Sequence, residues 1–416
     1  MSNTLIDRLI GKAIEHGTLK LTRHDGRSAT YGSPHPDYPD VAIRLTDGKV
    51  IRDIALDPKL GVGEAYMDGR IVIERGGIME LIELVRRNAP WEAKGSFGRP
   101  ALHRRAMKRL AFIKDSFNNP FKSKDNVAHH YDIGNDLYKL MLDEQHMQYS
   151  CGYWPREGMT LGEAQEAKLA HIAAKLMLEP GNRVLDIGCG WGGMAIFLAS
   201  RANVTVTGIT LSEEQLALAR ERAEAAGVAD KVTFELVDYR DLAARGERYD
   251  RIVSVGMFEH VGVPQYETFF RDCKRMLSGD GVMLLHTIGR FGNPVAAEAF
   301  TRKYIFPGGY IPALSQMMEA SQKVRLMATD VEVLRLHYAK TLREWYARCM
   351  EHRERIVAMF DERFFRMWTF YLAGAVSTFE WGGLCNFQVQ YSRNRYALPL
   401  TRDYIETAEQ ALLSAR

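Results

Sequence analysis

The chain has 416 residues, of which 46% are hydrophobic and 26% are charged, which is enough apolar material for a large buried core and for two or three domains. Its formal net charge of +3 is too small to argue for a nucleic acid partner, and no apolar run reaches the roughly 18 residues of a membrane span. The scattered cysteines are Cys151, Cys189, Cys273, Cys349 and Cys385. They form no C-x-x-C pair, so neither a disulfide framework nor a metal site is predicted, and we expect a cytoplasmic protein with reduced thiols.

Residues 1–88 predict a small α+β domain. They open with an amphipathic helix that contains acids, unlike a secretory signal. Strand-like pieces follow at 19–22 and 41–45, and a helix is expected over 77–87. Residues 89–125 hold prolines, glycines and little apolar periodicity, which predicts a linker with one short basic helix.

The linker is strongly basic. Between Lys94 and Lys124 the only acid is Asp115, whereas the cations are Lys94, Arg99, Arg104, Arg105, Lys108, Arg109, Lys114, Lys122 and Lys124. Such a run is often only a solvated surface. The alternative is a peripheral anchor for anionic lipid, because each cation near an anionic membrane contributes about 1 kcal/mol.

From residue 126 to 416 the pattern changes to a single α/β unit. Helices are expected over 212–226 and 265–277, among others. They alternate with apolar strands at 184–187, 204–208, 232–236, 250–255 and 281–286. This alternation predicts a doubly wound sheet of parallel strands, the Rossmann-like fold class.

A glycine-rich turn closes the first of these strands, where residues 184–193 read V-L-D-I-G-C-G-W-G-G. Gly188, Gly190 and Gly193 fit the dinucleotide pattern G-x-G-x-x-G. The same run also fits D-x-G-x-G-x-G through Asp186, Gly188, Gly190 and Gly192. Either pattern predicts a nucleotide cofactor beside the following helix.

The residues after the next two strands favour one of these cofactors. A dinucleotide site expects an acid for the ribose about 20 residues beyond the glycines, but the strand 204–208 runs into Ile209, Thr210 and Leu211. Asp186 and Asp238 instead occupy positions typical of class I methyltransferases that use S-adenosylmethionine. The sequence therefore favours the methyl donor.

The chain from residue 126 to 393 resembles the cyclopropane fatty acid synthases and the related mycolic acid cyclopropane synthases. The G-V-G-E-A-Y-M-D-G segment at Gly61 resembles the extra N-terminal domain of the longer bacterial synthases. The segments that carry the main resemblance are H-Y-D-I-G-N-D-L-Y at His130, Y-S-C-G-Y-W at Tyr149, V-L-D-I-G-C-G-W-G at Val184, G-I-T-L-S-E-E-Q at Gly208, F-E-H-V-G at Phe258 and H-T-I-G at His286.

This resemblance implies methylene transfer from S-adenosylmethionine to the cis double bond of an unsaturated phospholipid acyl chain, forming a cyclopropane ring. An isolated alkene is a weak nucleophile, so the enzyme must position it in a water-free pocket. A base must then remove a proton from the new methyl group, and the family is understood to use bound bicarbonate. Peripheral contact with membrane phospholipids is implied, and a homodimer is one assembly that we consider.

The resemblance also implies roles for individual residues. The anion site would comprise Cys151, Glu259, His286, Ile288 and Tyr338. The cofactor site would comprise Tyr149, Ser150, Asp186, Gly188, Gly190, Gly192, Thr210, Gln215, Asp238 and Tyr239. The T-L-S-x-x-Q pattern takes the place of the missing acid after the second strand.

Plainer interpretations of these residues stay open. Cys151 alone would be a small buried hydrophobe, and Tyr338 alone would be a core tyrosine. Glu259, expected at the end of a buried strand, could belong to a structural ion pair. The tandem His129-His130 does not suggest a metal site, because neighbouring residues on a helix diverge. The aromatic run 364–379 is too short to span a bilayer and would wall an acyl pocket or pack in the core.

Other functions remain as alternatives. One is methylation of an unsaturated acyl chain without ring closure, which would leave a methyl or methylidene branch. Another is a small-molecule N-methyltransferase with a similar core, which the anion-site residues disfavour. The last is a non-catalytic lipid-binding module that senses S-adenosylmethionine.

Overall fold

The computed structural model describes residues 3–93, 134–295 and 298–415. The basic segment 94–124 and the tandem histidines lie outside the described residues. The chain divides into two compact units, each of which is described by itself. The first holds the described residues up to 93 together with 298–307 and 342–383. This division differs from the three consecutive regions that the composition predicts, 1–88, 89–125 and 126–416, because helices from late in the chain join the N-terminal part.

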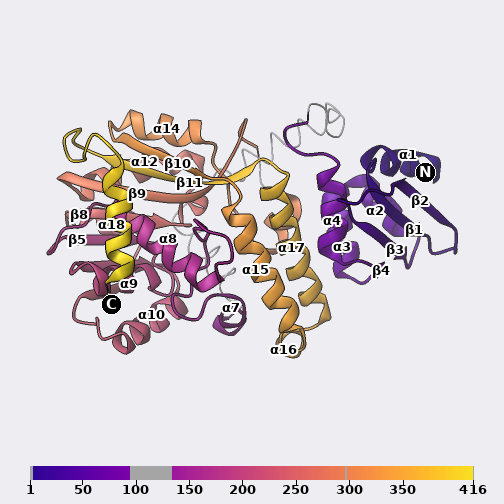
Figure 1. The fold of residues 1–416 in the computed structure, drawn as a ribbon, viewed down its shortest axis with the longest axis horizontal. Coiled ribbons are helices and arrows are strands. Elements are labelled where there is room, and N and C mark those ends of the chain that lie inside the picture. The colour runs from indigo at the N-terminus through magenta and orange to yellow at the C-terminus, as the bar shows by residue number, and fades with distance from the viewer. Residues whose placement is uncertain (1–2, 94–133, 296–297, 416) are drawn as a thin grey trace. The chain divides into compact units, whose positions relative to one another are not determined.

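The N-terminal part of the first unit is a four-stranded sheet in the order β2-β1-β3-β4 with helices (Figure 1). β1 is parallel to β3 and antiparallel to β2, and β3 is antiparallel to β4. The strands are β1 (Gly17–Thr22), β2 (Ser28–Ser33), β3 (Asp40–Leu45) and β4 (Ile71–Arg75). The helices are α1 (Asn3–Ala13), α2 (Lys49–Leu56), α3 (Pro58–Met67) and α4 (Ile78–Arg87). The small α+β domain expected from the sequence is present.

The aromatic helix α17 (Glu362–Glu380) supplies core to this first unit. Trp368 is fully buried, and the Phe370 ring lies 6.2 Å from the Tyr66 ring of α3 and 4.7 Å from the Phe300 ring of α13 (Ala299–Tyr304). At Gly63 a Cβ atom would lie 2.5 Å from the Phe300 ring, so the glycine permits close approach. The aromatic run 364–379 was expected either to wall an acyl pocket or to pack in the core, and these contacts support core packing. The unit also contains α16 (Arg353–Met359) and the part of α15 (His337–Glu351) from Leu342.

The second unit contains a seven-stranded mixed sheet in the order β10-β11-β9-β8-β5-β6-β7. β5 to β9 run parallel, as the sequence predicts, whereas β11 is antiparallel to β9 and β10 is antiparallel to β11. The parallel strands are β5 (Arg183–Ile187), β6 (Thr205–Thr210), β7 (Val232–Leu236), β8 (Tyr249–Val255) and β9 (Leu277–Arg290). The two added strands are β10 (Met327–Leu334) and β11 (Leu384–Ser392).

Helices cover both faces of this sheet, so residues of one strand alternate between two cores (Figure 1). On β5, Val184 joins a cluster with Leu169 and Phe197, whereas Leu185 joins a cluster with Phe269 and Met317. The helices and short 3₁₀ turns are α7 (Asn135–Met141), α8 (Leu161–Lys175), α9 (Gly193–Arg201), α10 (Glu213–Ala225), α11 (Tyr239–Ala244), η1 (Phe258–His260), η2 (Val263–Gln265), α12 (Tyr266–Met276), α14 (Leu314–Lys323) and α18 (Asp403–Ser414).

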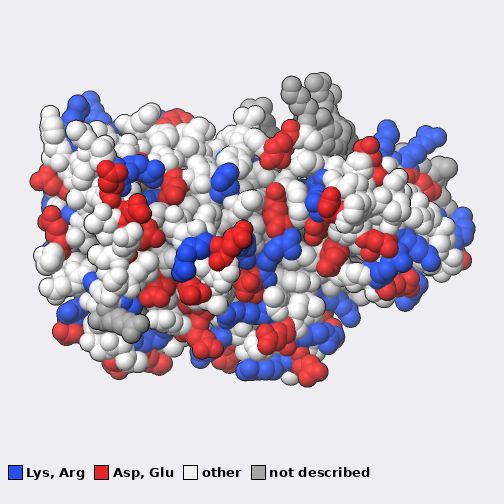
Figure 2. Space-filling view, viewed as in Figure 1, with Lys and Arg blue, Asp and Glu red and all other residues white. Residues whose placement is uncertain are grey.

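The described surface has no dominant charge on the face shown in Figure 2, where acidic and basic side chains are interspersed. Among the described residues, no helix is both long and apolar enough to cross a membrane.

Candidate active site

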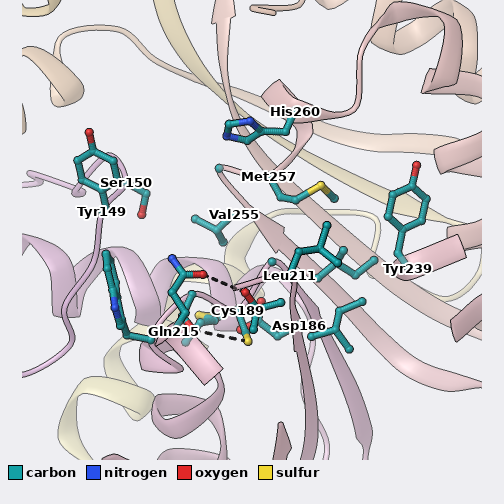
Figure 3. Close-up of a pocket in the computed structure, with 18 of the residues that line it drawn as sticks. Tyr149, Ser150, Asp186, Cys189, Leu211, Gln215, Tyr239, Val255, Met257 and His260 are labelled. Atoms are coloured by element: carbon teal, nitrogen blue, oxygen red, sulfur yellow. Dashed lines mark hydrogen bonds between the residues drawn. The ribbon is translucent and has the colours of Figure 1, made fainter. Parts of the chain in front are cut away.

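A cavity opens in the second unit where the parallel strands β5, β6, β7 and β8 end (Figure 3). Open α/β sheets bind ligands at this edge. Of the ten residues expected at the cofactor, nine line the cavity: Tyr149, Ser150, Asp186, Gly188, Gly190, Thr210, Gln215, Asp238 and Tyr239. The ends of β5, β6 and β7 and one preceding loop therefore bring together nine predicted residues that span 90 positions of the sequence, from Tyr149 to Tyr239.

Glycine is required at two positions of the loop for different structural reasons. Gly190 has a φ of +54°, and a Cβ atom there would meet nothing within 4 Å, so the backbone is open towards the cavity that it lines. Gly192 is not among the lining residues. It caps α9 in a left-handed conformation, and its Cβ would lie 2.6 Å from the Phe234 ring. Contact of Gly192 with a cofactor is therefore not supported, because the loop turns it towards the core.

Asp186 is a buried carboxyl at the end of β5, and its Oδ2 has no hydrogen-bond partner among the described residues. Burial raises the pKa of Asp186 to about 7, and the nearby Lys168 opposes this rise. Lys168 is itself fully buried on α8, and burial lowers its pKa to about 7. An orphaned acceptor at the cavity wall fits a ligand that donates hydrogen bonds or carries positive charge.

Lys168 also holds the loop that carries Tyr149 and Ser150. Its Nζ donates to Ser150 Oγ at 3.0 Å and to Gln148 Oε1, and both of these residues line the cavity. Asp143 adds a second brace by accepting from the backbone N–H of Gln148 at 2.9 Å.

Polar side chains after β6 and β7 are fixed by short local hydrogen bonds. Thr210 Oγ1 donates to Gln215 Oε1 at 2.9 Å (Figure 3), which leaves the Gln215 amide N–H groups for other acceptors. Asp238 caps α11 and accepts from Arg240 Nε and Nη2, each at 2.7 Å. These hydrogen bonds hold the side chains in place at the cavity wall.

Glu259 and Ile288 are joined directly. The Ile288 N–H donates to Glu259 Oε1 at 2.6 Å, whereas Glu259 Oε2 is buried without a partner among the described residues. Burial raises the pKa of Glu259 to about 7. The residue lies on η1, beyond the end of β8, and so corrects the expectation that it ends a strand. No described side chain forms the structural ion pair considered for it.

Of the other three expected anion-site residues, strand position brings His286 close to Ile288, whereas Cys151 and Tyr338 lie on two other segments that are joined to each other. His286 is two residues before Ile288 on the same strand, inside β9 and not at its end as expected. Cys151 is buried, with its Sγ donating to the Gly152 carbonyl at 3.2 Å. The Gly152 N–H in turn donates to Thr341 Oγ1 at 3.0 Å on α15, which also carries the buried Tyr338. None of the five anion-site residues lines the cofactor cavity.

Some cavity residues were missed from the sequence. His260 and Met257 lie on its wall (Figure 3), and Gln148 and Arg240 line it as well. Burial lowers the pKa of His260 to about 4, so its ring is neutral near pH 7. The F-E-H motif was a signal for His260, which follows Glu259 directly. Gln148 and Lys168 carried no such signal, because their meeting depends on tertiary packing between α8 and the loop.

Comparison with known proteins shows which family has a sequence similar to this chain. The family described as mycolic acid cyclopropane synthetase matches residues 119–389, and a domain of unknown function matches residues 7–94. The chain is 39% identical to the cyclopropane-fatty-acyl-phospholipid synthase of Escherichia coli K12 over 84% of this chain and 87% of that protein. It is 33% identical to the tuberculostearic acid methyltransferase UfaA1 of Mycobacterium tuberculosis over 93% of this chain and 90% of that protein.

A solved structure is similar to the catalytic part. It is the mycolic acid cyclopropane synthase CmaA1 in complex with SAH and CTAB, with a TM-score of 0.61 and 33% identity over 65% of this chain and 98% of that one.

Proposed function

Because this chain belongs to the mycolic acid cyclopropane synthetase family, we propose that it transfers a methylene group from S-adenosylmethionine to the cis double bond of unsaturated phospholipid acyl chains and closes a cyclopropane ring. It is an S-adenosylmethionine-dependent methyltransferase. The observation that carries the proposal is the cavity at the ends of β5 to β8, where the orphaned Asp186 carboxyl faces polar groups from the next strands.

Different cavity residues would bind different parts of the cofactor. S-adenosylmethionine, when bound, supplies the electrophilic methyl group. We assign the open backbone at Gly190 and the carboxyl of Asp186 to its amino-acid part, with Tyr149 and Ser150 beside them. Gln215 would donate to the ribose through the amide N–H groups that Thr210 leaves available, and Asp238 with Tyr239 would flank the adenine.

The anion site is proposed around Glu259. Bicarbonate, when bound, supplies the base that accepts a proton from the transferred methyl group. Glu259 suits such a ligand because Oε2 is buried without a partner among the described residues and the raised pKa keeps a proton available for sharing. The residues assigned with it are Cys151, His286, Ile288 and Tyr338. Peripheral contact with anionic phospholipid completes the proposal and rests on the basic sequence between Lys94 and Lys124.

An isotope experiment tests the reaction class. Purified protein is incubated with vesicles of cis-monounsaturated phospholipid and S-adenosylmethionine that carries a CD3 group. Ring closure and a methylidene branch each release one deuteron from the transferred methyl group and retain CD2, and fragmentation separates these two products. Loss of a proton from the acyl chain itself would instead leave a methyl-branched alkene that retains CD3. Retention of CD3 in such a product would overturn ring formation.

A further inference from the structure

Behind His286 lies a row of buried polar side chains that the proposed chemistry does not use. His286 on β9 is paired in register with Gln388 on β11, and the Gln388 side chain reaches Lys175 at the end of α8. His286, Gln388 and Lys175 are all almost inaccessible to solvent. Buried polar groups that are retained in such a row impose a fixed orientation on one another.

Lys175 fixes which way the Gln388 amide faces. Its Nζ lies 2.8 Å from Gln388 Oε1 and also donates to Glu332. Burial lowers the pKa of Lys175, and the Glu332 carboxylate opposes this by stabilising the ammonium form. An ammonium group only donates hydrogen bonds. The Gln388 oxygen must therefore face Lys175, and its NH2 group must face the other way.

The NH2 group of Gln388 then fixes the protonation of the imidazole. Gln388 Nε2 lies 3.2 Å from His286 Nδ1. Because an amide NH2 donates and does not accept, Nδ1 must be the accepting nitrogen. Burial lowers the pKa of His286 well below its ordinary value, so the ring is neutral and carries its one proton on Nε2.

The protonated nitrogen faces Asn386, which lies opposite Ile288, two residues nearer the carboxyl end of β9. The Asn386 amide is 3.1 Å from Nε2, and its Oδ1 has no partner among the described residues. With the amide turned over, Oδ1 accepts from Nε2–H and both groups are satisfied. The Nε2–H group thus lies on the side of Ile288 and of Glu259, which Ile288 binds.

We propose that Lys175 and Gln388 are positioning residues that set the tautomer of His286, so that its Nε2–H donates to Asn386 on the side of the anion site. This inference rests on the proposed function, because it gives the neutral imidazole the part of orienting the Asn386 amide beside Ile288, one of the residues assigned to the anion. The relay resembles in principle the partner that orients an imidazole in other active sites.

The tautomer can be read directly by ¹⁵N NMR of the full chain labelled on histidine, with the His286 signals assigned by their loss in His286→Gln. We expect a pyridine-type shift for Nδ1 and a pyrrole-type shift for Nε2. In Gln388→Glu the carboxylate can only accept, so the proton should move to Nδ1 or the ring should become cationic. Cyclopropanation should then fall by about tenfold, as for one lost hydrogen bond beside the anion site, while cofactor affinity is retained.

Gln390→Glu is the matched control. Gln390 is another buried glutamine of β11, but it donates to the Lys175 carbonyl and Tyr404, not to His286. It should leave the His286 shifts unchanged. If Gln388→Glu does not fold, Lys175→Met should allow the amide to turn over and produce mixed tautomers.

A proton on Nδ1 of His286 in the unmodified protein would overturn the inference. A changed tautomer in Gln388→Glu with an undiminished rate of cyclopropanation would overturn it as well. Absence of any cyclopropane product from the unmodified protein would instead contradict the proposed function while leaving the tautomer measurable.

Discussion

The Glu259 carboxyl has one oxygen bound by Ile288 and the other without a partner among the described residues. Burial raises its pKa from the ordinary 4.5 to about 7, so the folded chain holds this proton more tightly than the unfolded chain does. The stability that the group contributes is therefore present below about pH 4.5 and is lost as the pH rises through 7. The loss is of the order of 3 kcal/mol at most.

Glu259→Gln should remove this pH dependence while preserving the shape of the side chain. The unfolding temperature of the variant, relative to the parent, should therefore be higher at about pH 8 than at about pH 5. Differential scanning fluorimetry at both pH values measures the difference. The exposed Glu213→Gln is the control. An equal offset at both pH values would show that the carboxyl is not held in a perturbed state.

Gly190 offers a test of the cofactor loop. Its Cβ position is open to the cavity, so Gly190→Val would place a side chain where the ligand must approach, and we expect cofactor affinity to fall at least tenfold by calorimetry. Gly227→Val is a matched control, because Gly227 also has a positive φ of +68° and open space but is not among the residues lining the cavity. Equal affinities in the two folded variants would remove the loop from the cofactor site.

Many individual residues of the site could be predicted from the sequence. Each short motif directly follows a strand, and the carboxyl ends of parallel strands meet at one edge of the sheet. Thr210 and Gln215 lie five positions apart and meet across one helix cap. Asn386 and Gln388 could not be predicted, since they reach His286 only through an antiparallel strand about 100 residues later. Gly192 fitted the pattern but serves packing against Phe234, and spacing alone does not separate these two uses.

Helix α8 positions the cavity wall through Lys168. Lys168→Met should free Gln148 and Ser150 and leave Asp186 without its nearby cation, so we expect cofactor affinity to fall about tenfold or more. Lys274→Met is the control, because Lys274 Nζ donates to the Val324 carbonyl and the residue is not among those lining the cavity. Unchanged affinity in a folded Lys168→Met protein would show that the loop is held by Asp143 alone.

The strands and helices between residues 183 and 290 agree with the sequence prediction to within a few residues, except that β9 extends beyond both predicted ends. Buried parallel strands are nearly continuous apolar runs, which makes them recognisable. β10 was not predicted, because its side chains alternate between exposed and partly buried at the sheet edge. The polar Asn386, Gln388 and Gln390 obscured β11, although all are buried.

At the level of the whole chain, the two units could not be predicted from a composition shift. Phe370 packs against Tyr66 of the N-terminal part and against Phe300, and nothing local in the sequence indicates contacts across more than 200 residues. Among the N-terminal elements, α1, β1, β3 and α4 followed from period and turns, whereas β2, β4, α2 and α3 were not predicted.

The basic segment provides a membrane prediction that rests on its sequence. Replacing Arg104, Arg105, Lys108 and Arg109 by glutamine should weaken binding to anionic liposomes and reduce its salt dependence. A control with the same change in net charge replaces Arg52, Arg75, Lys323 and Arg353, which are exposed ion-pair residues. Sedimentation with liposomes compares them. Equal losses in both variants would make the effect one of net charge only.

The most direct test of the enzyme's activity is mass spectrometry of phospholipid acyl chains after expression in a bacterial host that lacks such an enzyme. We expect monounsaturated chains to gain a single CH2 group, with fragmentation that locates a ring at the former double bond, and we expect Glu259→Gln to reduce this product by about 10²-fold, as for the loss of general-base catalysis. Unmodified acyl chains in cells that contain the folded protein, or a branched product without a ring, would contradict the account.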